Sequence, residues 1–555
     1  MGKKGIRMRG RQRRRRSLGS LLRWPKHSGQ TAAVRQPAND TAANGQQQSG
    51  LRIVLWDTRH GGAFKDFAGG FGVGQFRGTG LRSRIIEHFY NRDFRSPSLA
   101  YGYLAAGLAK SGHTVEYCLE ETPAADVYIF NPALMTLPHE LEVIRRLNDK
   151  SPKTKILVVG TVASTMAASF ADVDCKVVSG EPEQLIVKLD EVLAATDQQV
   201  AIGTVADLDT LPFPDWSIFP YWQFRVGYDF WKFPTAYVQS SRGCTLSCSY
   251  CPYIILENKV RTRSPALVAQ EIRRDMEEYD FRSFKFRDPL FGARRKHAEE
   301  MAAEIGKLPH KIQFSVESRI ELLSRDVLKM LRDVGLTSVT VGIETPSRDT
   351  LLKYKRAPIK DDKQSQFVAM CRSLGIRVIA GFMIGFPEDT RQSIRAVLRY
   401  AKTVDPFVAN FNVCTPYPGT GFIDEIAPQI ASRDWSRYDV YTPNLKYEHL
   451  TSDEVAELHQ ECFRQYYFRW QYLKDNWRFL LPRVAGLASA FGWQKPADEA
   501  QAPAKANPAN QLPVTAAATA LKVVNPSDES CAGTASPAPV DVVQLDASAP
   551  GRKSA

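Results

Sequence analysis

Short apolar segments alternate with segments of helical spacing along most of this 555-residue chain. The runs LRIVLW at Leu51–Trp56 and KILVV at Lys155–Val159 are typical of strands that are buried on both faces. Segments such as Leu99–Ser111, between such strands, carry apolar residues at the spacing of a helix. This alternation predicts parallel sheets covered by helices, which places the chain in the α/β class.

A proline-rich, extended segment at Leu208–Trp216 (LDTLPFPDW) interrupts the alternation and predicts an interdomain linker over residues 206–225. Residues 51–205 are expected to form a doubly wound, Rossmann-like domain, with the glycine-rich stretch 57–96 as a long loop. The loops that follow the strands of such a sheet share its carboxyl edge, where ligands bind. We expect the following loops to meet there: Asp57–Gly80, Asn131–Leu134 and Gly160–Thr165.

The alternation resumes after the linker, and its six strand–helix units predict a partial (β/α)6 barrel of the TIM type over residues 226–425. A helical carboxy-terminal region is expected over residues 426–494. Its segment Ser452–Leu473 is rich in aromatic residues. We expect this segment to be a helix that packs against the barrel, and the alternative is a wall that faces the substrate.

The two ends of the chain differ in composition from its middle. Residues 1–50 hold twelve Lys and Arg and one acidic residue, so most of the formal charge of +13 belongs to them. Residues 495–555 are rich in Ala, Pro and Ser. Both segments are predicted to be disordered tails. The alternative for the basic tail is weak contact with nucleic acid or an anionic membrane, although the near-neutral remainder makes a nucleic-acid partner unexpected.

Three of the nine cysteines lie within eight residues, in the segment SRGCTLSCSYCPY at Ser241–Tyr253. Cys244, Cys248 and Cys251 follow a predicted strand with Cx3CxxC spacing. Cysteine thiolates are the usual ligands of iron–sulfur clusters. Three thiolates on a four-iron cubane leave one iron free to bind a small molecule.

Two other kinds of site use clustered cysteines. A structural zinc site needs a fourth Cys or His at short spacing, and none follows within about forty residues, since His297 is the nearest. A redox dithiol at Cys248–Cys251 would leave Cys244 unexplained. The spacing therefore favours an iron–sulfur cluster, with both alternatives ranked below it.

The cysteine segment resembles the signature of the radical S-adenosylmethionine (SAM) superfamily, with aromatic Tyr250 before the last cysteine. Gly243 and Pro252 also fit the signature. The resemblance extends over residues 210–425. It rests on these further segments: FRDPLF at Phe286–Phe291 with Asp288, ESR at Glu317–Arg319, GIE at Gly342–Glu344, GFMIGFPE at Gly381–Glu388 and TPYPGT at Thr415–Thr420.

This resemblance implies a [4Fe–4S] cluster on the three cysteines and SAM as a second cofactor. It implies SAM contacts at Tyr250, Arg319, Glu344, Gly381 and Gly385. A buried ion pair with an arginine is the alternative for Glu344, and structural pairing is the alternative for Arg319. No catalytic residue is named.

The amino-terminal domain resembles the cobalamin-binding domain of the B12-dependent branch of the superfamily. The matching segments are Pro97–Val115, Asp126–Phe130, Val159–Ser164 and Gly180–Glu183 (GEPE). The chain lacks the DxHxxG segment that supplies an axial histidine in other cobalamin enzymes. Relatives in this branch commonly lack it too, so cobalamin is an expected cofactor for which no contact residue is named.

Together these resemblances imply a cobalamin-dependent radical SAM methyltransferase that acts, through a 5′-deoxyadenosyl radical, on an unactivated carbon of a small-molecule or lipid-like metabolite. An electron donor such as flavodoxin or ferredoxin and a cytoplasmic location, with weak membrane association through the basic tail, are also expected. The alternatives are a radical cyclase or oxidoreductase and a nucleic-acid-modifying or nucleic-acid-binding protein. A methylthiotransferase is disfavoured, since residues 51–205 offer only Cys118 and Cys175 for its second cluster.

Overall fold

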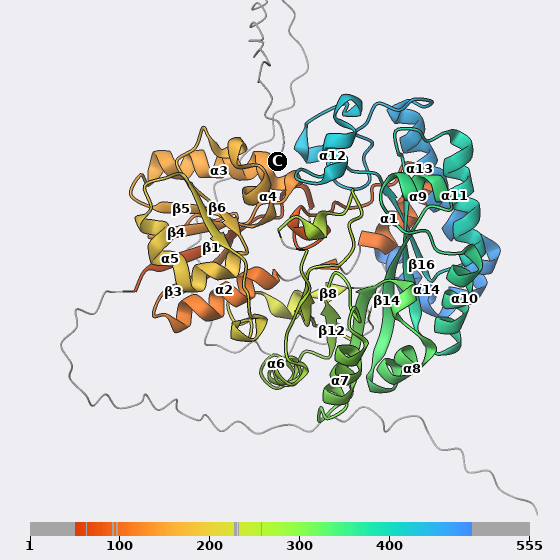
Figure 1. Cartoon of the computed structure of the whole chain (residues 1–555), viewed down its shortest axis with the longest axis horizontal. Coiled ribbons are helices and arrows are strands. Elements are labelled where there is room, and N and C mark those ends of the chain that lie inside the picture. Colours follow the sequence, from red (N-terminus) through yellow and green to blue (C-terminus); the bar gives the residue numbers. More distant parts are fainter. Residues whose placement is uncertain are drawn as a thin grey trace, which may run out of the picture. The chain divides into compact units, whose positions relative to one another are not determined.

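The computed structural model of the chain describes residues 50–490, with the exception of a few internal positions (Figure 1). These positions are residues 63, 92–93, 96–97, 227–229, 231 and 257. The tails expected over residues 1–50 and 495–555 therefore lie almost wholly outside the described residues. The chain divides into two units at residue 485, and all that follows on the site concerns the described residues of the first unit.

The amino-terminal domain is built on a parallel sheet that, within the described part of the chain, has six strands in the order β3-β1-β4-β5-β6-β7. Strand β1 lies inside the sheet, paired with β3 and β4, and four of its six residues are buried. The strands are β1 Arg52–Asp57, β3 Thr114–Leu119, β4 Val127–Phe130, β5 Lys155–Val158, β6 Lys176–Gly180 and β7 Gln199–Gly203.

Helices cover both faces of this sheet, which confirms the doubly wound fold (Figure 1). Alternate residues of β1 belong to different cores: Ile53 packs with α2 and α5, whereas Val54 packs with α3 and α4. This alternation follows from the strand period of two residues. The helices of this domain are α1 Gly80–Asn91, α2 Leu99–Lys110, α3 Leu137–Lys150, α4 Gly160–Thr165 and α5 Leu185–Ala194.

Two segments expected to be loops contain helices. Helix α1 lies within the glycine-rich stretch 57–96, and α4 takes up the whole of Gly160–Thr165. The glycines that suggested a loop precede α1, apart from Gly80 at its first position, so they do not set the stability of the helix. Helix α1 is held instead by tertiary packing, because Ile86 belongs to the main core.

The loops at the carboxyl edge of the sheet do meet, as the doubly wound topology predicts. Leu134 N donates to Phe71 O at 2.9 Å, and Thr161 Oγ1 donates to Gly69 O. Gly70 has a φ of 98°, and a Cβ atom there would lie 2.7 Å from Thr161 Oγ1. Only glycine therefore allows these two loops to approach so closely.

The second sheet is also parallel and, among the residues described, has six strands in the order β16-β15-β14-β13-β12-β9. It remains open between β9 and β16, which confirms the partial barrel. The strands are β9 Thr235–Val238, β12 Ser283–Phe286, β13 Gln313–Ser318, β14 Leu336–Glu344, β15 Arg377–Ile384 and β16 Val408–Val413. The helices between them are α6 Pro265–Glu278, α7 Arg295–Ile305, α8 Arg325–Val334, α9 Arg348–Lys353, α10 Asp361–Ser373 and α11 Arg391–Val404.

The region expected to be helical over 426–494 is helical only from Ser452 onward. Before that, the short helix α12 (Gly421–Glu425) is followed by 3-10 turns and loops up to Thr451. The aromatic segment of this region is two helices rather than one, α13 (Ser452–Tyr467) and α14 (Trp470–Ala490). The ring of Phe463 in α13 stacks on Phe76 with centroids 4.2 Å apart. The buried aromatic side chains of α13 thus pack into the core, as expected, and do not form an open wall.

The linker packs closely against the barrel, although its sequence suggested an extended connection. Trp216 is fully buried, and its Nε1 donates to Asp275 of α6 at 3.3 Å. Two short antiparallel ribbons complete the described strands: β2 (Phe94–Arg95) with β8 (Arg225–Val226), and β10 (Ser241–Arg242) with β11 (Arg261–Thr262). A search of the described helices found none long and apolar enough to span a bilayer.

Candidate active site

The three cysteines lie on the loop between β10 and β11, which we call the cluster loop (residues 243–260). Cys244 and Cys248 are buried, and Cys251 is half-buried. The loop is shaped by its own backbone: Cys251 N donates to Cys248 O at 3.1 Å, and Cys244 N donates to Asn258 O at 3.1 Å. The loop therefore presents the three thiols to the protein interior instead of to solvent.

All three thiols line one cavity of about 390 Å³. The barrel contributes the ends of β13 to β16, and the amino-terminal domain contributes its carboxyl-edge loop. Aromatic and aliphatic side chains make up much of the wall. The apolar lining includes Phe64, Phe67, Val73, Leu246, Leu290, Met383, Val440 and Tyr441.

Burial makes the cysteines poor thiolates by themselves. It raises the pKa of Cys251 to about 12 and raises that of Cys244 as well. A metal that binds thiolates removes their protons outright, so iron would reverse this preference. The guanidinium of Arg356 already lies beside one of the three, with Nη1 4.0 Å from Cys248 Sγ.

Several buried polar atoms around the cavity have no hydrogen-bond partner within the protein. They are Tyr250 Oη, Arg319 Nη1, Asn410 Oδ1 and Tyr417 Oη. Such atoms are rare in native structures and call for a ligand or bound water. Three thiols on one cavity, together with the unsatisfied polar groups around them, fit a cluster with a polar small molecule bound next to it.

The expected SAM contacts fall on this cavity with one exception. Tyr250, Arg319, Glu344 and Gly381 line it. Gly385 does not line it; its backbone N donates to Asp389 Oδ2 at 2.8 Å in the turn after β15.

Glu344 and Arg319 have partners inside the protein as well as a face on the cavity. Glu344 Oε1 lies 3.4 Å from Arg356 Nη2, so the buried ion pair considered from the sequence is present. Burial raises the pKa of Glu344, and the charges of Arg356 and Arg319 oppose that rise. Arg319 pairs with Glu321 at 2.6 Å and keeps Nη1 unsatisfied, so structural pairing and ligand binding coexist in this side chain.

The profile of the radical SAM superfamily matches residues 238–401, from the end of β9 into α11. The cluster loop lies within that match, and so do all four lining residues just named. Tyr250 is on the loop, Arg319 directly follows β13, Glu344 ends β14 and Gly381 is in β15. The matched segment is a radical SAM domain. A [4Fe–4S] cluster and SAM are the cofactors of that superfamily, and the chain offers both the thiols and the cavity that they need.

Similar curated proteins include an uncharacterised methyltransferase of Pyrococcus horikoshii, which is 26% identical over 48% of this chain and 57% of its own length. The anaerobic magnesium-protoporphyrin IX monomethyl ester cyclase of Cereibacter sphaeroides is 26% identical over 65% of this chain and 60% of its own. The chain thus spans about three fifths of the length of these two relatives.

Among solved structures, the cobalamin-dependent SAM radical enzyme OxsB, with aqua-cobalamin and SAM bound, superposes with a TM-score of 0.54. It shares 13% sequence identity, and the match covers 79% of this chain and 69% of that one. At this identity the likeness is one of fold, and it extends over both the amino-terminal domain and the radical SAM barrel.

Sequence reasoning missed several residues of the radical SAM site. Arg356 follows α9 outside any motif, and only its position after the GIE strand hinted at a role. Asn410 and Asn412 alternate along β16 and both line the cavity, as residues of one strand face must. Polar residues at alternate positions of a buried parallel strand are unusual, and that pattern was the available signal.

Asp288, singled out from the FRDPLF segment, does not line the cavity but holds the segment that enters the cluster loop. It accepts hydrogen bonds from Ser240 N at 2.7 Å, from Ser240 Oγ at 2.5 Å and from Ser241 Oγ at 2.6 Å. Burial raises its pKa, and these hydrogen bonds oppose the rise. Asp288 thus fixes the chain just before β10.

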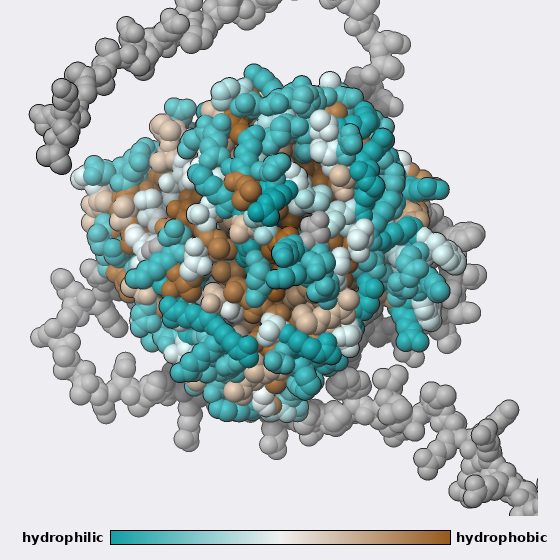
Figure 2. All heavy atoms as spheres, turned by 45° about the vertical axis from the view of Figure 1, so that its right-hand side comes forward, coloured by the Kyte–Doolittle hydropathy of each residue, from teal (hydrophilic) through white to brown (hydrophobic). Residues whose placement is uncertain are grey.

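Figure 2 shows the molecular surface from a second direction, with apolar side chains gathered toward the centre of that face and hydrophilic ones around them. Apolar patches rimmed by polar residues mark binding regions more often than the rest of a surface does. The apolar lining of the cavity comes from both domains, and most of its side chains are half-buried.

Proposed function

We propose that the chain is a cobalamin-dependent radical SAM methyltransferase that acts on an unactivated carbon of a small-molecule or lipid-like metabolite. The observation that carries this proposal is the shared cavity: the three thiols of the cluster loop and the carboxyl-edge loop of the amino-terminal domain line the same space of about 390 Å³. When bound, the cluster and SAM supply a 5′-deoxyadenosyl radical, and methylcobalamin supplies a methyl group.

In this proposal Cys244, Cys248 and Cys251 hold the cluster. Arg319 binds the carboxylate of SAM through its unsatisfied Nη1, since an arginine forms strong charge-assisted bonds to carboxylates. Glu344 accepts from hydroxyl groups while Arg356 keeps its charge balanced. Gly381 leaves room for the ligand, because a Cβ atom there would meet nothing closer than 3.9 Å.

The apolar residues of the amino-terminal loop suit the face of a flat macrocycle. Phe64, Phe67, Ala68 and Val73 lie on the side of the cavity that faces the sheet's carboxyl edge. No histidine among the described residues lines the cavity. We therefore propose that cobalamin is held there without an axial histidine from the protein.

The apolar wall also argues for the substrate class. A cavity whose wall is mostly aromatic and aliphatic, with a few unsatisfied polar atoms such as Asn410 Oδ1, favours a largely apolar molecule with one or two polar groups. The proposal includes a one-electron donor of the flavodoxin or ferredoxin type. It also includes a cytoplasmic location, where free thiols stay reduced.

A second candidate is radical cyclisation or oxidation without methyl transfer, which the similarity to an ester cyclase of Cereibacter sphaeroides favours. Methyl transfer consumes SAM as a methyl donor and releases S-adenosylhomocysteine, whereas the alternative does not. Anaerobic incubation with SAM, reductant, hydroxocobalamin and extracts of cells that lack the gene separates the two, because every methyl group must then come from SAM. Formation of S-adenosylhomocysteine with a product one methyl heavier supports the proposal, and 5′-deoxyadenosine alone supports the cyclase.

A further inference from the structure

The base of the cluster loop carries an unusual pair of like charges. Strands β10 and β11 form the two-stranded ribbon that closes the loop, and Arg242 stands directly opposite Arg261 in their register. Like charges that face each other across an antiparallel pair destabilise it. Both side chains are also nearly buried, with 11% and 8% of their surface exposed, so water screens their repulsion poorly.

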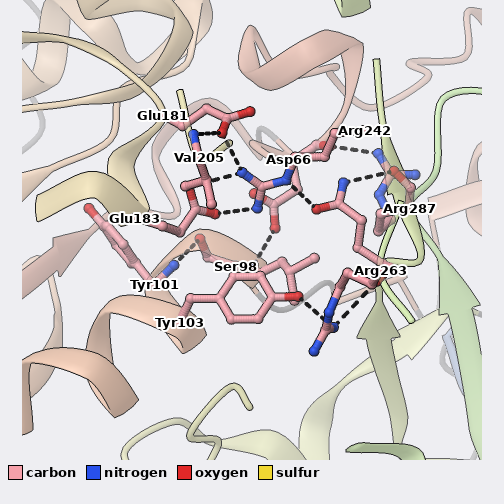
Figure 3. Close-up of polar contacts among 12 residues, drawn as sticks. Asp66, Ser98, Tyr101, Tyr103, Glu181, Glu183, Val205, Arg242, Arg263 and Arg287 are labelled. Carbon is pink, nitrogen blue, oxygen red and sulfur yellow. Dashed lines mark hydrogen bonds and ion pairs between the residues drawn. The ribbon is translucent and has the colours of Figure 1, made fainter. Parts of the chain in front are cut away.

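Two glutamates of the amino-terminal domain neutralise this pair (Figure 3). Glu183 makes a two-pronged contact with Arg242, at 2.7 Å and 3.3 Å. Glu181 bridges both arginines, at 3.1 Å from Arg242 and at 2.7 Å from Arg261. The four side chains form a cluster without net charge at the boundary between the two domains.

Further hydrogen bonds fix the positions of these charged side chains. Glu181 Oε2 also accepts from Val205 N at 2.7 Å, and Arg261 Nη1 donates to Val205 O. Arg242 Nε donates to Gln239 Oε1 at 2.7 Å. Although burial raises the pKa of Glu181, the hydrogen bond from Arg261 and the charge of Arg242 lower it overall, so Glu181 is ionised at neutral pH.

The two arginines flank the cluster loop in the sequence, so the two glutamates act on the position of that loop. Arg242 immediately precedes Gly243 and Cys244, and Arg261 ends the same loop. Gly69 of the amino-terminal domain makes a further contact, since a Cβ atom there would overlap the carbonyl of Pro252, next to Cys251. Both ends and the middle of the cluster loop therefore touch the amino-terminal domain.

We propose that Glu181 and Glu183 are positioning residues for the iron–sulfur cluster, which hold the cluster loop in place through Arg242 and Arg261. The amino-terminal domain then has a task besides cofactor binding, because the barrel alone would carry two uncompensated cations at the base of its cysteine loop. Removing one partner of a buried ion pair leaves a buried charge unpaired and is strongly destabilising. This inference rests on the proposed presence of the cluster.

The test compares full-length wild type with Glu183→Gln and Glu181→Gln after anaerobic reconstitution with iron and sulfide. We would measure three quantities: the iron content per chain, the electron paramagnetic resonance spectrum of the reduced cluster with and without SAM, and the thermal midpoint of unfolding. We expect each variant to keep about half of the iron or less, and to give a spectrum altered from that of wild type. The double variant Glu183→Gln with Arg242→Gln removes both members of one pair and leaves Glu181 opposite Arg261, so it carries no unpaired charge and should recover both iron and spectrum.

Asp275→Asn is the matched control, because Asp275 is also a buried carboxylate in an ion pair, at 2.9 Å from Arg274, but touches the linker and not the cluster loop. It should lose stability while iron and spectrum stay as in wild type. Equal iron and identical spectra in wild type, Glu181→Gln and Glu183→Gln would overturn the inference while leaving the proposed function intact. A wild-type chain that takes up no cluster would overturn both.

Discussion

Arg356 lies between Cys248 and Glu344: its Nη1 is 4.0 Å from Cys248 Sγ, and its Nη2 is 3.4 Å from Glu344 Oε1. Nη2 also donates to Gly342 O at 2.6 Å, so the guanidinium is fixed against β14. A fixed cation beside a thiolate favours the more negatively charged, reduced form of a cluster.

Arg356→Gln is therefore expected to make the cluster harder to reduce. The potential should fall by roughly 60 mV, the equivalent of a tenfold change for one electron. An anaerobic redox titration followed by electron paramagnetic resonance measures it. Lys355→Gln is the control, since Lys355 is exposed and pairs with Glu425 at 3.2 Å. Equal shifts in both variants would refute a local effect of Arg356.

Arg319→Gln should weaken SAM binding by about 10- to 100-fold, because a hydrogen bond to a charged group contributes roughly 1.5–3 kcal/mol. The comparison with Glu321→Gln sharpens this prediction. That variant frees Arg319 from its 2.6 Å ion pair without touching the cavity, so SAM should bind at least as tightly as in wild type. Anaerobic calorimetry on the reconstituted chain measures both. Weaker binding in Glu321→Gln than in Arg319→Gln would contradict the assigned role.

Two glycines of neighbouring strands should respond differently to alanine. At Gly342 a Cβ atom would overlap Glu344 Oε1 and lie 3.0 Å from Arg356 Nη2, so Gly342→Ala should lower the free energy of unfolding by about 1–3 kcal/mol. At Gly381 the nearest atom is 3.9 Å away, so Gly381→Ala should change it by less than about 0.5 kcal/mol. Because Gly381 lines the cavity, its variant should nevertheless bind SAM more weakly. Denaturant titration and binding measurements together test this pair.

His459 makes stability depend on pH. It is buried in α13, with Nε2 2.8 Å from Phe411 O, and burial lowers its pKa to about 4. Because the unfolded chain takes up this proton near pH 6.5, stability is complete above pH 6.5 and falls as the pH drops toward 4. The loss should reach about 3 kcal/mol, at 1.36 kcal/mol per unit.

Denaturant titrations between pH 4 and pH 7.5 measure this slope. His459→Gln should show a flatter dependence on pH than wild type over that range. His449→Gln, at an exposed site, should keep the wild-type dependence. A wild-type slope that survives in His459→Gln would assign the effect to other groups.

The features that were predicted correctly are those that follow from the pattern of neighbouring residues. The strand Leu51–Trp56 is a continuous apolar run and appears as β1, and the cysteine spacing placed three thiols on one loop beside one cavity. Helix α1 was missed because the glycines ahead of it suggested that the whole stretch 57–96 is a loop, whereas the packing of Ile86 into the main core holds the helix in place.

Contacts between distant residues had no local signal. Glu183 and Arg242 are 59 positions apart, and Glu181 and Arg261 are 80 apart. The GEPE segment was recognised as part of a domain pattern, but its partners follow only from the way the two sheets are packed together. The contact of Arg356 with Cys248 could likewise not be predicted, because it depends on how the connection after α9 is placed in the fold.

The proposal that the three cysteines hold a cluster that cleaves SAM is tested most directly by measuring the cleavage product. Wild type and Cys248→Ser are reconstituted anaerobically and incubated with SAM and dithionite, and 5′-deoxyadenosine is quantified by liquid chromatography. We expect 5′-deoxyadenosine from wild type and none above background from Cys248→Ser, because Cys248 is a proposed ligand of the cluster. Wild-type protein that carries a full cluster and forms no 5′-deoxyadenosine, or equal amounts from both proteins, would contradict it.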